Sequence, residues 1–432
     1  MTGRWNSFAS LALLFAVVCA PLILSQRGTK YTADERNWHI PATRQIRAHW
    51  PSLDLKADSL SATAPGYHYF LATVSLVTGT SRLALRGITW GVSLGLLYFL
   101  WQLFPSDRRM WAMAALLPLA MSNFFVKSSV WVVTDNPGML CATVTLAALF
   151  LSEGKAATWR AGIAAGAATF IRQLHVWTAA PTALLAWRTW HRSDRRPIDL
   201  ALSLPVILPV AVVLLLFLSW HGLVPPAWQS YQVNAGIGTG AIASFCYILA
   251  VDFIIGLWFW LAAVDEKLTT ALRSAPALLA AAAGLALALV TPTDYNPPDG
   301  RWGGYLWNLA AHLPVIGHRS IVFLLLTPLG AALLAAMAAR LDRHIGRFEA
   351  LAWFGSYTVW AATFLPNKFA YQRYFEPMTL VFFILWLLLL VAKTNMIRQK
   401  PGWLWTLAVV QLAITLATAH YETWFGPITF PD

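Results

Sequence analysis

Charged residues are scarce in this chain of 432 residues. Asp, Glu, Lys and Arg make up 12% of the sequence and hydrophobic residues 58%, whereas a soluble domain carries roughly 25% charged residues. So few charges are not enough to cover the surface of a soluble protein of this size. Together with a mean hydropathy of +0.57, this scarcity excludes a soluble enzyme, a disordered chain and a nucleic-acid-binding domain.

Cysteine and the common cofactor motifs are also scarce or absent from the sequence. The three cysteines, Cys19, Cys141 and Cys246, lie in apolar runs and are interpreted as small buried hydrophobic residues. The sequence has no Walker motif, no Gly-x-Gly-x-x-Gly, no His/Cys cluster with metal-ligand spacing and no Asp-x-Asp of the kind that holds a nucleotide sugar. We therefore expect no cofactor, and dependence on a divalent metal stays open.

Long apolar runs are what the chain has in abundance, and its 23 Trp and 23 Phe are typical of membrane interfaces. Because a helix needs about 20 apolar residues to cross a bilayer, we expect an all-α, polytopic bundle of about thirteen helices in one domain over residues 1–432. The candidate spans are 8–25, 84–104, 110–125, 137–152, 158–171, 174–190, 199–219, 242–263, 274–291, 320–339, 349–365, 377–392 and 402–419.

Two regions depart from this simple pattern. The run 66–79 is short and ends in Gly-Thr-Ser, so we interpret it as a helix lying at the interface. The runs 158–171 and 174–190 are separated by two residues, and a re-entrant or half-length pair is the interpretation we give them. A cleaved signal peptide is the alternative for the first apolar run, but no convincing cleavage site follows it, so we expect it to be retained.

The basic residues predict which face of the membrane each loop occupies. With the N-terminus inside, the inner loops hold more than half of the 31 Lys and Arg residues, as the positive-inside rule requires of short loops. Counting 66–79 as a span would invert every later loop and place the basic cluster 193–196 outside. These inner residues are Arg4, Arg108, Arg109, Lys155, Arg160, Arg188, Arg192, Arg195, Arg196, Lys267, Arg273, Arg340, Arg343, Arg347, Lys393, Arg398 and Lys400.

The first outer segment, residues 26–83, carries an acidic pair, Asp34-Glu35, a few residues beyond a membrane helix. Carboxylates this close to lipid are costly and usually have a function or a cationic partner. The structural alternative is that Asp34 caps a short helix or pairs with Arg36 or Arg44.

Two further outer loops place charges at helix ends. The second contains Lys127 and sets Asp135 at the mouth of a helix. The third contains Arg172, whose neighbours at that depth must be protein or a water-filled cavity. The structural alternative for Arg172 is a pair with Asp252, the lone charge inside the eighth span.

The remaining outer loops, residues 220–241, 292–319 and 366–376, include Arg301 and Arg373-Tyr374. Isolated cations near helix ends suit a substrate with an anionic headgroup and a lipid tail. The tail can stay in the bilayer while Arg and Lys neutralise a phosphate at the interface.

Six motifs occur in one order along the chain: Asp34-Glu35-x-x-x-His39-Ile40-Pro41-x-x-x-Gln45, Pro65-Gly66-Tyr67, Thr134-Asp135, Arg172-Gln173, Asn234-Ala-Gly236-Ile and Arg373-Tyr374-Phe375. This order resembles the membrane-embedded GT-C glycosyltransferases. Within them it is most similar to the dolichyl-phosphate-glucose alpha-1,2-glucosyltransferases, which add the terminal glucose of a lipid-linked oligosaccharide. The resemblance covers roughly residues 8–390. The chain departs from it at Gly240-Ala241, where the family has Gly-Asp, and its short inner loops are typical of a bacterial relative.

The resemblance implies a GT-C fold whose large first external loop carries interfacial helices. It implies transfer of a hexose, with glucose favoured, from a polyprenyl-phosphate donor to a lipid-linked or cell-envelope glycan acceptor. The site would face the periplasm from a bacterial inner membrane, or the ER lumen in a eukaryote. The implied catalytic residues are Asp34, as general base, Glu35 and Asp135. The candidate substrate-binding residues are His39, Lys127, Arg172, Gln173, Arg301, Arg373, Tyr374 and Arg86.

A transporter or flippase of lipid-linked glycans is the competing class, because it would also have about a dozen helices. Such proteins often contain internal repeats and broken helices with charges at the membrane midplane. The sequence has no obvious two-fold repeat, and most of its ionisable residues lie in the expected outer loops. This distribution favours an interfacial enzyme with the lipid bilayer, the donor and the acceptor as partners and no nucleic acid.

Overall fold

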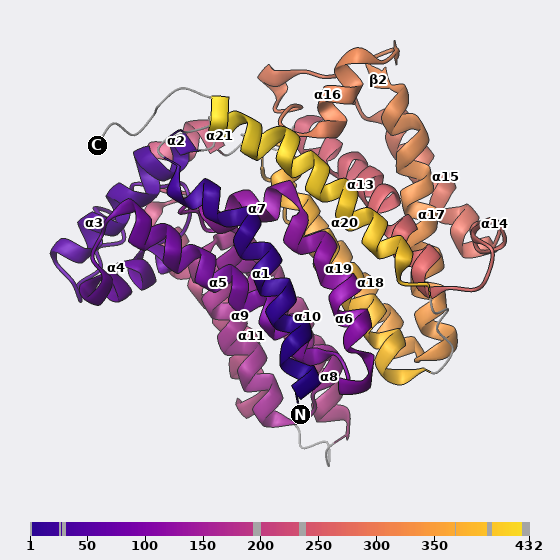
Figure 1. The fold of residues 1–432 in the computed structure, drawn as a ribbon, viewed down its shortest axis with the longest axis horizontal. Helices are drawn as coiled ribbons and strands as arrows, with labels where there is room; N and C mark the ends of the chain where they lie inside the picture. The colour runs from indigo at the N-terminus through magenta and orange to yellow at the C-terminus, as the bar shows by residue number, and fades with distance from the viewer. Residues whose placement is uncertain are drawn as a thin grey trace. The chain divides into compact units, whose positions relative to one another are not determined.

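The computed structural model describes residues 2–25, 27, 32–192, 200–232, 239–367, 369–394 and 400–425, and these fold almost entirely into helices (Figure 1). Each of the thirteen apolar runs coincides with a helix or with consecutive helical segments. The basic cluster 193–196 and the Asn234-Ala-Gly236-Ile motif lie outside the described residues.

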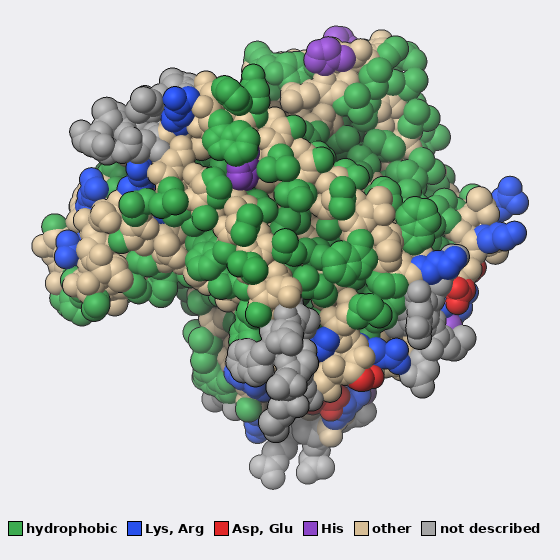
Figure 2. Space-filling model, viewed as in Figure 1, with side chains coloured by type: hydrophobic (Ala, Val, Ile, Leu, Met, Phe, Trp, Pro, Cys, Tyr) green, Lys and Arg blue, Asp and Glu red, His purple; other side chains and the backbone are tan. Residues whose placement is uncertain are grey.

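Length and composition make six helices in the described part of the chain suitable for crossing a bilayer, or seven if one bent pair counts as a single span. The chain is therefore an integral, multi-pass membrane protein, although the expected number of thirteen spans is not confirmed. Large apolar side chains cover the outer faces of these helices, as the face in Figure 2 illustrates. On α11 (Leu200–Trp220), for example, Leu218 is 63% exposed. Such faces are expected where helices meet lipid.

The chain divides into two compact units. Unit 1 consists of residues 1–103, 120–231 and 410–432, and unit 2 of residues 104–119 and 232–409. The two units differ in which residues pack together. This division does not test the expectation of a single functional domain, which stays a prediction.

Unit 1 is built from helices that pack side by side. In it α9 contacts both α8 and α11, while α4 contacts α3, α5 and α9. Its elements are α1 (Thr2–Leu24), α2 (Thr32–Asp34), the π-helix η1 (Glu35–His39), α3 (Ile40–Ala48), α4 (Gly66–Thr78), α5 (Arg82–Leu103), α7 (Asn123–Val130), α8 (Asp135–Leu151), α9 (Lys155–Ile171), η3 (Gln173–Thr178), α10 (Ala179–Arg192), α11, η4 (Pro226–Trp228), α12 (Gln229–Gln232), the π-helix η6 (Leu416–His420) and α21 (Tyr421–Phe425).

Unit 2 packs around α19 (Gln372–Lys393), whose residues from Phe375 to Val391 are all buried. Helices α13, α17 and α18 contact it. The other elements are η2 (Ser106–Arg108), α6 (Arg109–Met121), α13 (Thr239–Ala263), α14 (Leu268–Leu272), α15 (Ala275–Val290), η5 (Pro297–Asp299), α16 (Tyr305–His312), the strands β1 (Val315–Ile316) and β2 (Arg319–Ser320), α17 (Ile321–His344), α18 (Arg347–Ala362) and α20 (Gly402–Thr415). The ends of α6, from Ala120, and of α20, from Val410, belong to unit 1. The strands pair antiparallel, with Val315 opposite Ser320 and Ile316 opposite Arg319.

The segment 66–79 forms a helix, α4, as expected. Its 13 residues extend for about 20 Å, which is less than the hydrocarbon thickness of about 30 Å. Its length therefore agrees with a helix that does not cross the membrane, and its place at the interface stays a prediction.

The expected span 110–125 is not one continuous helix. The chain bends by 72° between α6 and α7. Ser122 has extended backbone angles and its side chain accepts a hydrogen bond from the Phe125 amide, so it acts as the N-cap that starts α7. As a result Lys127, which we expected in a loop, lies on a helix.

The proposed short pair 158–171 and 174–190 also differs in detail. Helix α9 ends at Ile171, and a 3₁₀ segment, η3, replaces the first turn of the second helix. Helix α10 then begins at Ala179. The two helices have 17 and 14 residues, so both are short, as expected.

Candidate functional site

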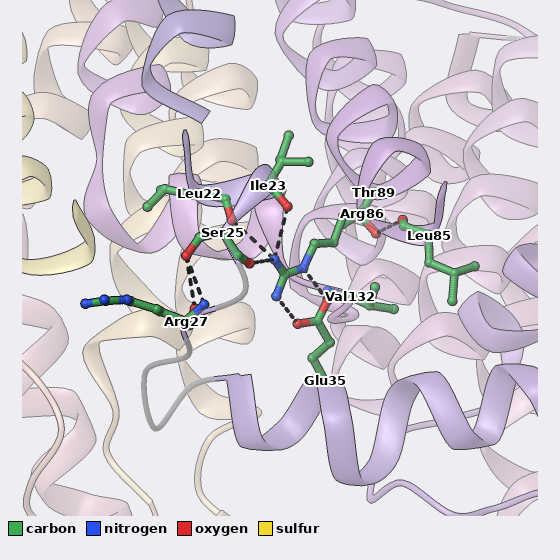
Figure 3. Close-up of polar contacts among 9 residues, drawn as sticks. All are labelled: Leu22, Ile23, Ser25, Arg27, Glu35, Leu85, Arg86, Thr89 and Val132. Atoms are coloured by element: carbon green, nitrogen blue, oxygen red, sulfur yellow. Dashed lines mark hydrogen bonds and ion pairs between the residues drawn. The ribbon is translucent and has the colours of Figure 1, made fainter. Parts of the chain in front are cut away.

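The acidic pair Asp34-Glu35 is anchored by a buried arginine. Arg86 on α5 donates from Nε to Glu35 Oε1 at 2.8 Å and from Nη2 to Oε2 at 2.6 Å, and both side chains are fully buried (Figure 3). The third guanidinium nitrogen, Nη1, points at the end of α1 and donates to the carbonyls of Leu22, Ile23 and Ser25. A bidentate pair of this kind fixes orientation as well as charge.

This pair connects three stretches of unit 1 that are far apart in the sequence. Figure 3 shows the guanidinium of Arg86 between the end of α1 and Glu35 on the first outer loop. The amide of Val132, just beyond α7, donates to Glu35 Oε1 at 3.3 Å. The end of α1, the first outer loop and the second outer loop therefore meet at one carboxylate. Glu35 and Arg86, which we predicted as catalytic and substrate-binding residues, are placed against each other.

Asp34 lies directly before this anchor and is half-buried. It is the last residue of α2, and its side chain makes no capping hydrogen bond to the π-helix η1 that follows. The capping alternative is therefore wrong. Arg36 donates to Asn37 and Arg44 to the Thr80 carbonyl. Adjacent residues of a helix point about 100° apart, which agrees with a fully buried Glu35 beside a half-buried Asp34.

His39, predicted as a substrate-binding residue, ends the same π-helix and contacts a second histidine. Its Nδ1 lies 2.8 Å from Nε2 of His68 on α4, and both rings are buried. A hydrogen bond between two imidazoles needs one donor and one acceptor, so a proton on both facing nitrogens would break it. Burial lowers the pKa of His68 well below its usual value, and the neighbouring His39 lowers it further. The pair ties the first outer loop to α4.

Beneath these loops lies a small apolar cluster. Ile40, Tyr67, Leu71, Leu85 and Val132 form it, so α3, α4, α5 and the second outer loop share one core. Burial of such side chains contributes roughly 1.5–3 kcal/mol each. This apolar packing therefore helps to hold together the segments that carry Glu35, His39 and Arg86.

Asp135 begins α8, and Arg172 lies just beyond the end of α9. Their side chains form an ion pair, with 16% and 12% of the respective surfaces exposed. The alternative pairing of Arg172 with Asp252 is therefore wrong. Asp252, in α13, instead accepts hydrogen bonds from Tyr357 Oη at 2.5 Å and Thr379 Oγ1 at 3.4 Å.

Two residues fix the mouth of α8 around Asp135. Asn136 is fully buried, and its amide nitrogen lies within 3.1 Å of Ser93 Oγ, the Phe125 carbonyl and Ser129 Oγ. A side chain at Gly138 would collide with the ring of His175, at 2.6 Å from Nε2. Sequence reasoning missed Asn136, although an Asn between an acid and the Pro that opens a helix is a signal for such a role.

Gln173 joins the third outer loop to the first. It donates to the carbonyls of Ala62 and Leu223, and its own oxygen accepts from the Ala64 amide at 3.0 Å. These contacts occupy both ends of the amide, so Gln173 holds loops together. Three outer loops of unit 1 thus converge through Glu35, the Asp135–Arg172 pair and Gln173.

Lys127 lies on α7 and is almost completely buried. Its Nζ lies 3.5 Å from Glu422 Oε2 and 5.9 Å from the ring centroid of Trp131. Glu422 lies in the C-terminal helix, Gly402–Phe425, which is made of α20, η6 and α21. Both contacts are within unit 1. The partner Glu422 was not predicted from the sequence, which separates the two residues widely.

In unit 2, two acidic side chains hold Arg301 in a buried position. It is 3% exposed and forms ion pairs with Asp294 at 2.8 Å and Asp299 at 3.2 Å. Its Nε also donates to the Asp294 carbonyl. The loop 292–319, which contains Arg301, contacts the loop 366–376, because the Ala370 amide donates a hydrogen bond to the Gly300 carbonyl.

Arg373 and Tyr374 lie beside this junction at the start of α19. The Arg373 guanidinium lies 4.9 Å from the ring centroid of Tyr374 and 5.6 Å from that of Tyr371, in cation–π geometry. Its Nη2 also contacts the Tyr374 hydroxyl at 3.0 Å. Both side chains are half-buried, which leaves the cation in a polar and aromatic setting at the entrance of a helix.

A buried network behind Arg373 was missed by sequence reasoning. Gln372 accepts from the Tyr247 hydroxyl at 2.6 Å and from the Tyr305 amide at 2.8 Å, and it donates to Glu376 at 2.5 Å. Gly304 is required here, because a Cβ would lie 2.4 Å from the Tyr247 hydroxyl. This network holds the backbone from which Arg373 projects.

Among the described residues, no group of three or more His, Cys, Asp or Glu side chains could hold a metal ion. The charged groups of the site are instead arginines, lysine and carboxylates. Carboxylates are groups that can accept a proton, and arginine and lysine are groups that can neutralise an anion.

No protein-family model matches the chain, and no curated protein matches it. Among solved structures, ArnT from Cupriavidus metallidurans bound to undecaprenyl phosphate is similar over 91% of this chain and 78% of that chain, with 15% identity and a TM-score of 0.41. A likeness this low establishes neither a common fold nor a common function. Membership of the GT-C glycosyltransferases therefore rests on the sequence motifs as a proposal.

Proposed function

We propose that this protein is an inverting GT-C glycosyltransferase that moves a hexose, with glucose favoured, from a polyprenyl-phosphate donor to a lipid-linked or cell-envelope glycan acceptor. The observation that carries the proposal is the anchor of Glu35 on Arg86, which fixes the acidic pair at the point where outer loops meet. The motifs that carry the family resemblance in three separate loops thereby become one region of unit 1.

Asp34 is the general base of the proposed reaction. Glu35 is unsuited to this role, because its oxygens accept hydrogen bonds from Arg86 and the Val132 amide in a fully buried site. It acts instead as a positioning residue for Asp34. The half-buried Asp34 keeps contact with solvent while its backbone is held by the anchor.

The chemistry needs only one acid. The acceptor hydroxyl attacks the anomeric carbon and gives its proton to Asp34, while the bond from that carbon to the phosphate oxygen breaks. Polyprenyl phosphate departs with the bonding electrons as an anion whose second pKa is about 6, so it needs no protonation near neutral pH. A positioned carboxylate contributes about 10²–10⁴-fold to such a transfer.

We assign some of the candidate residues to binding of the donor and others to holding the loops in place. Lys127, Arg172, Arg373 and Tyr374 are the candidates for binding the donor, because Arg and Lys neutralise phosphate. Asp135 orients the acceptor from its pair with Arg172. Arg86, Arg301, Gln173 and His39 support the loops through the contacts described above.

The site is proposed to face the periplasm from a bacterial inner membrane, or the ER lumen in a eukaryote, because the expected inner loops are rich in Lys and Arg. Cysteine accessibility in intact cells tests this orientation. An introduced Ser52→Cys should react with an impermeant maleimide, and Ser193→Cys should not. Labelling of Ser193→Cys from outside would reverse the proposed topology.

Product analysis tests the function itself. Purified protein in detergent is incubated with a panel of polyprenyl-phosphate hexoses and extracted membrane lipids, and products are identified by mass spectrometry. The proposal predicts conversion of one donor to polyprenyl phosphate together with a glycosylated acceptor. A protein that moves lipid-linked glycans across liposome membranes but leaves every donor intact is a flippase, and the proposal is then wrong.

A further inference from the structure

The C-terminal helix carries a polar stripe that docks on the break between α6 and α7. Thr415 Oγ1 donates to the Met121 carbonyl at 2.7 Å, and Thr418 Oγ1 donates to Asn123 Oδ1 at 2.8 Å. Glu422, one turn further, reaches Lys127 at 3.5 Å. All these residues belong to unit 1. The C-terminal helix therefore fixes the segment that carries Lys127.

The Lys127–Glu422 pair differs from a second Lys–Glu pair in the protein. Lys393 and Glu349 lie 2.9 Å apart, within the usual range for a strong hydrogen bond. In the first pair the distance is 3.5 Å, the lysine side chain is 6% exposed and the glutamate is 43% exposed. A deeply placed cation thus faces a loosely held, solvent-accessible carboxylate.

The place of this pair connects it with the proposed site. Val132, five residues beyond Lys127, donates its amide to Glu35, and Asp135 follows at the start of α8. Arg27, at the start of the first outer loop, donates to the carbonyl of Trp424. The last turn of the C-terminal helix therefore lies against two cations, Lys127 on α7 and Arg27 at the start of the first outer loop.

We propose that Glu422 is the resident counter-ion of an anion-binding site centred on Lys127, and that the phosphate of a lipid-linked substrate displaces it. The carboxylate neutralises the buried ammonium before the ligand arrives, because an uncompensated buried charge is strongly unfavourable. Polyprenyl phosphate, the monoester that leaves in the proposed reaction, brings up to two negative charges and three acceptor oxygens, more than the single charge of the carboxylate. The glutamate can then move into solvent, where half of its side chain already lies. Glu422 thereby sets the affinity for the phosphate group. This inference rests on the proposed function, because it takes Lys127 as a donor-binding residue.

Binding measurements on the full-length protein in detergent test the inference. The probe is undecaprenyl phosphate, which carries the headgroup and tail without a sugar, and binding is followed by the ligand-induced rise in melting temperature. Glu422→Gln removes the competing charge and keeps the size of the side chain. We expect it to bind the probe about two- to fivefold more tightly, as for loss of a partly exposed ion pair. Lys127→Met should weaken binding by at least tenfold.

Glu349→Gln is the matched control, since it also removes the acid of a Lys–Glu pair, and it should leave the affinity unchanged. Unchanged or weaker binding by Glu422→Gln, with Glu349→Gln unaffected, overturns the inference, because a counter-ion must compete with the ligand. This arm remains decisive even if Lys127→Met does not fold.

Two further arms separate the possible outcomes. Inorganic phosphate is tested at the same concentrations, and equally tight binding of it identifies free phosphate as the ligand and overturns the lipid assignment. Transfer of sugar is measured in parallel. Absence of transfer together with tighter binding by Glu422→Gln contradicts the proposed function and supports the anion site. Normal transfer without the affinity change contradicts the anion site alone.

Discussion

The outer loops of the two units stabilise their functional candidates in opposite ways. In unit 1 a fully buried ion pair, Arg86–Glu35, holds the backbone next to an acid, Asp34. In unit 2 Arg301 is buried, but its partners Asp294 and Asp299 are 21% and 49% exposed. The residue held nearby in unit 2 is a cation, Arg373.

The difference concerns how far the partners of a buried arginine are removed from solvent. Both oxygens of Glu35 accept hydrogen bonds from Arg86, and neither side chain reaches solvent. The carboxylates that pair with Arg301 keep contact with solvent. Because an uncompensated charge costs most where water cannot reach it, removal of the arginine should cost more in unit 1 than in unit 2.

The largest expected effect follows from removing the cation of the buried pair. Arg86→Met leaves Glu35 as an uncompensated charge in a site without solvent, so we expect a loss of about 3–5 kcal/mol in stability. Thermal unfolding in detergent measures it. The double variant Arg86→Met/Glu35→Gln should recover part of the loss, because no unpaired charge remains. Equal instability of the single and double variants would show that the charge pair is not the anchor.

A smaller effect is expected at Arg373, where the change concerns binding. Arg373→Lys keeps the charge but loses the planar fork that fits a phosphate. Loss of charge-assisted hydrogen bonds of about 1.5–3 kcal/mol corresponds to at least a tenfold rise in the donor KM. Steady-state kinetics with varied donor measure this rise. An unchanged KM in both Arg373→Lys and Arg373→Ala would leave Arg373 as an anchor at a helix end.

Removing the other buried arginine sharpens the comparison between the units. Arg301→Met leaves two carboxylates that already contact solvent, so we expect a loss of about 1–2 kcal/mol, below that of Arg86→Met. The same thermal unfolding assay measures both variants side by side. If Arg301→Met destabilises the protein as strongly as Arg86→Met, solvent contact of the partners does not decide the cost.

The smallest expected effect is a dependence on pH from the buried histidine pair. Since the pKa of His68 is lowered in the folded protein, the unfolded chain takes up a proton below its usual pKa of about 6.5. Stability should therefore be complete above that pH and fall as the pH decreases, by up to about 1.4 kcal/mol per pH unit. Melting temperatures at pH 7.5 and 5.5 test this. His68→Gln should reduce the difference, whereas His312→Gln, at an exposed position, should retain it.

Much of the helical framework could be predicted from the sequence, because apolar runs long enough to lie in a bilayer have few alternatives to a helix. The break at Ser122 could not, since a single serine in an apolar run is compatible with a continuous helix. The capping bond to Phe125 that decides it becomes visible only in the folded chain. The number of spans is equally undetermined, because helices of 14 to 17 residues are near the limit for crossing.

The contacts that the candidate residues make could not be predicted from the sequence. Asp34 and Glu35 are neighbours with the same local sequence, and only the tertiary contact with Arg86 separates them. Glu422 lies far from Lys127 along the chain, so no local pattern could pair them. Arg172 was given Asp252 as an alternative partner because both are isolated charges, whereas proximity to the mouth of α8 selects Asp135.

The role of Asp34 as general base is the central claim, and the transfer rate of Asp34→Asn tests it most directly. The change retains the shape of the side chain and removes its ability to accept the proton. We predict a folded protein with unchanged binding of undecaprenyl phosphate and a transfer rate lowered by at least about 10²-fold in single-turnover measurements at saturating donor. Transfer by Asp34→Asn at nearly the wild-type rate would contradict the account.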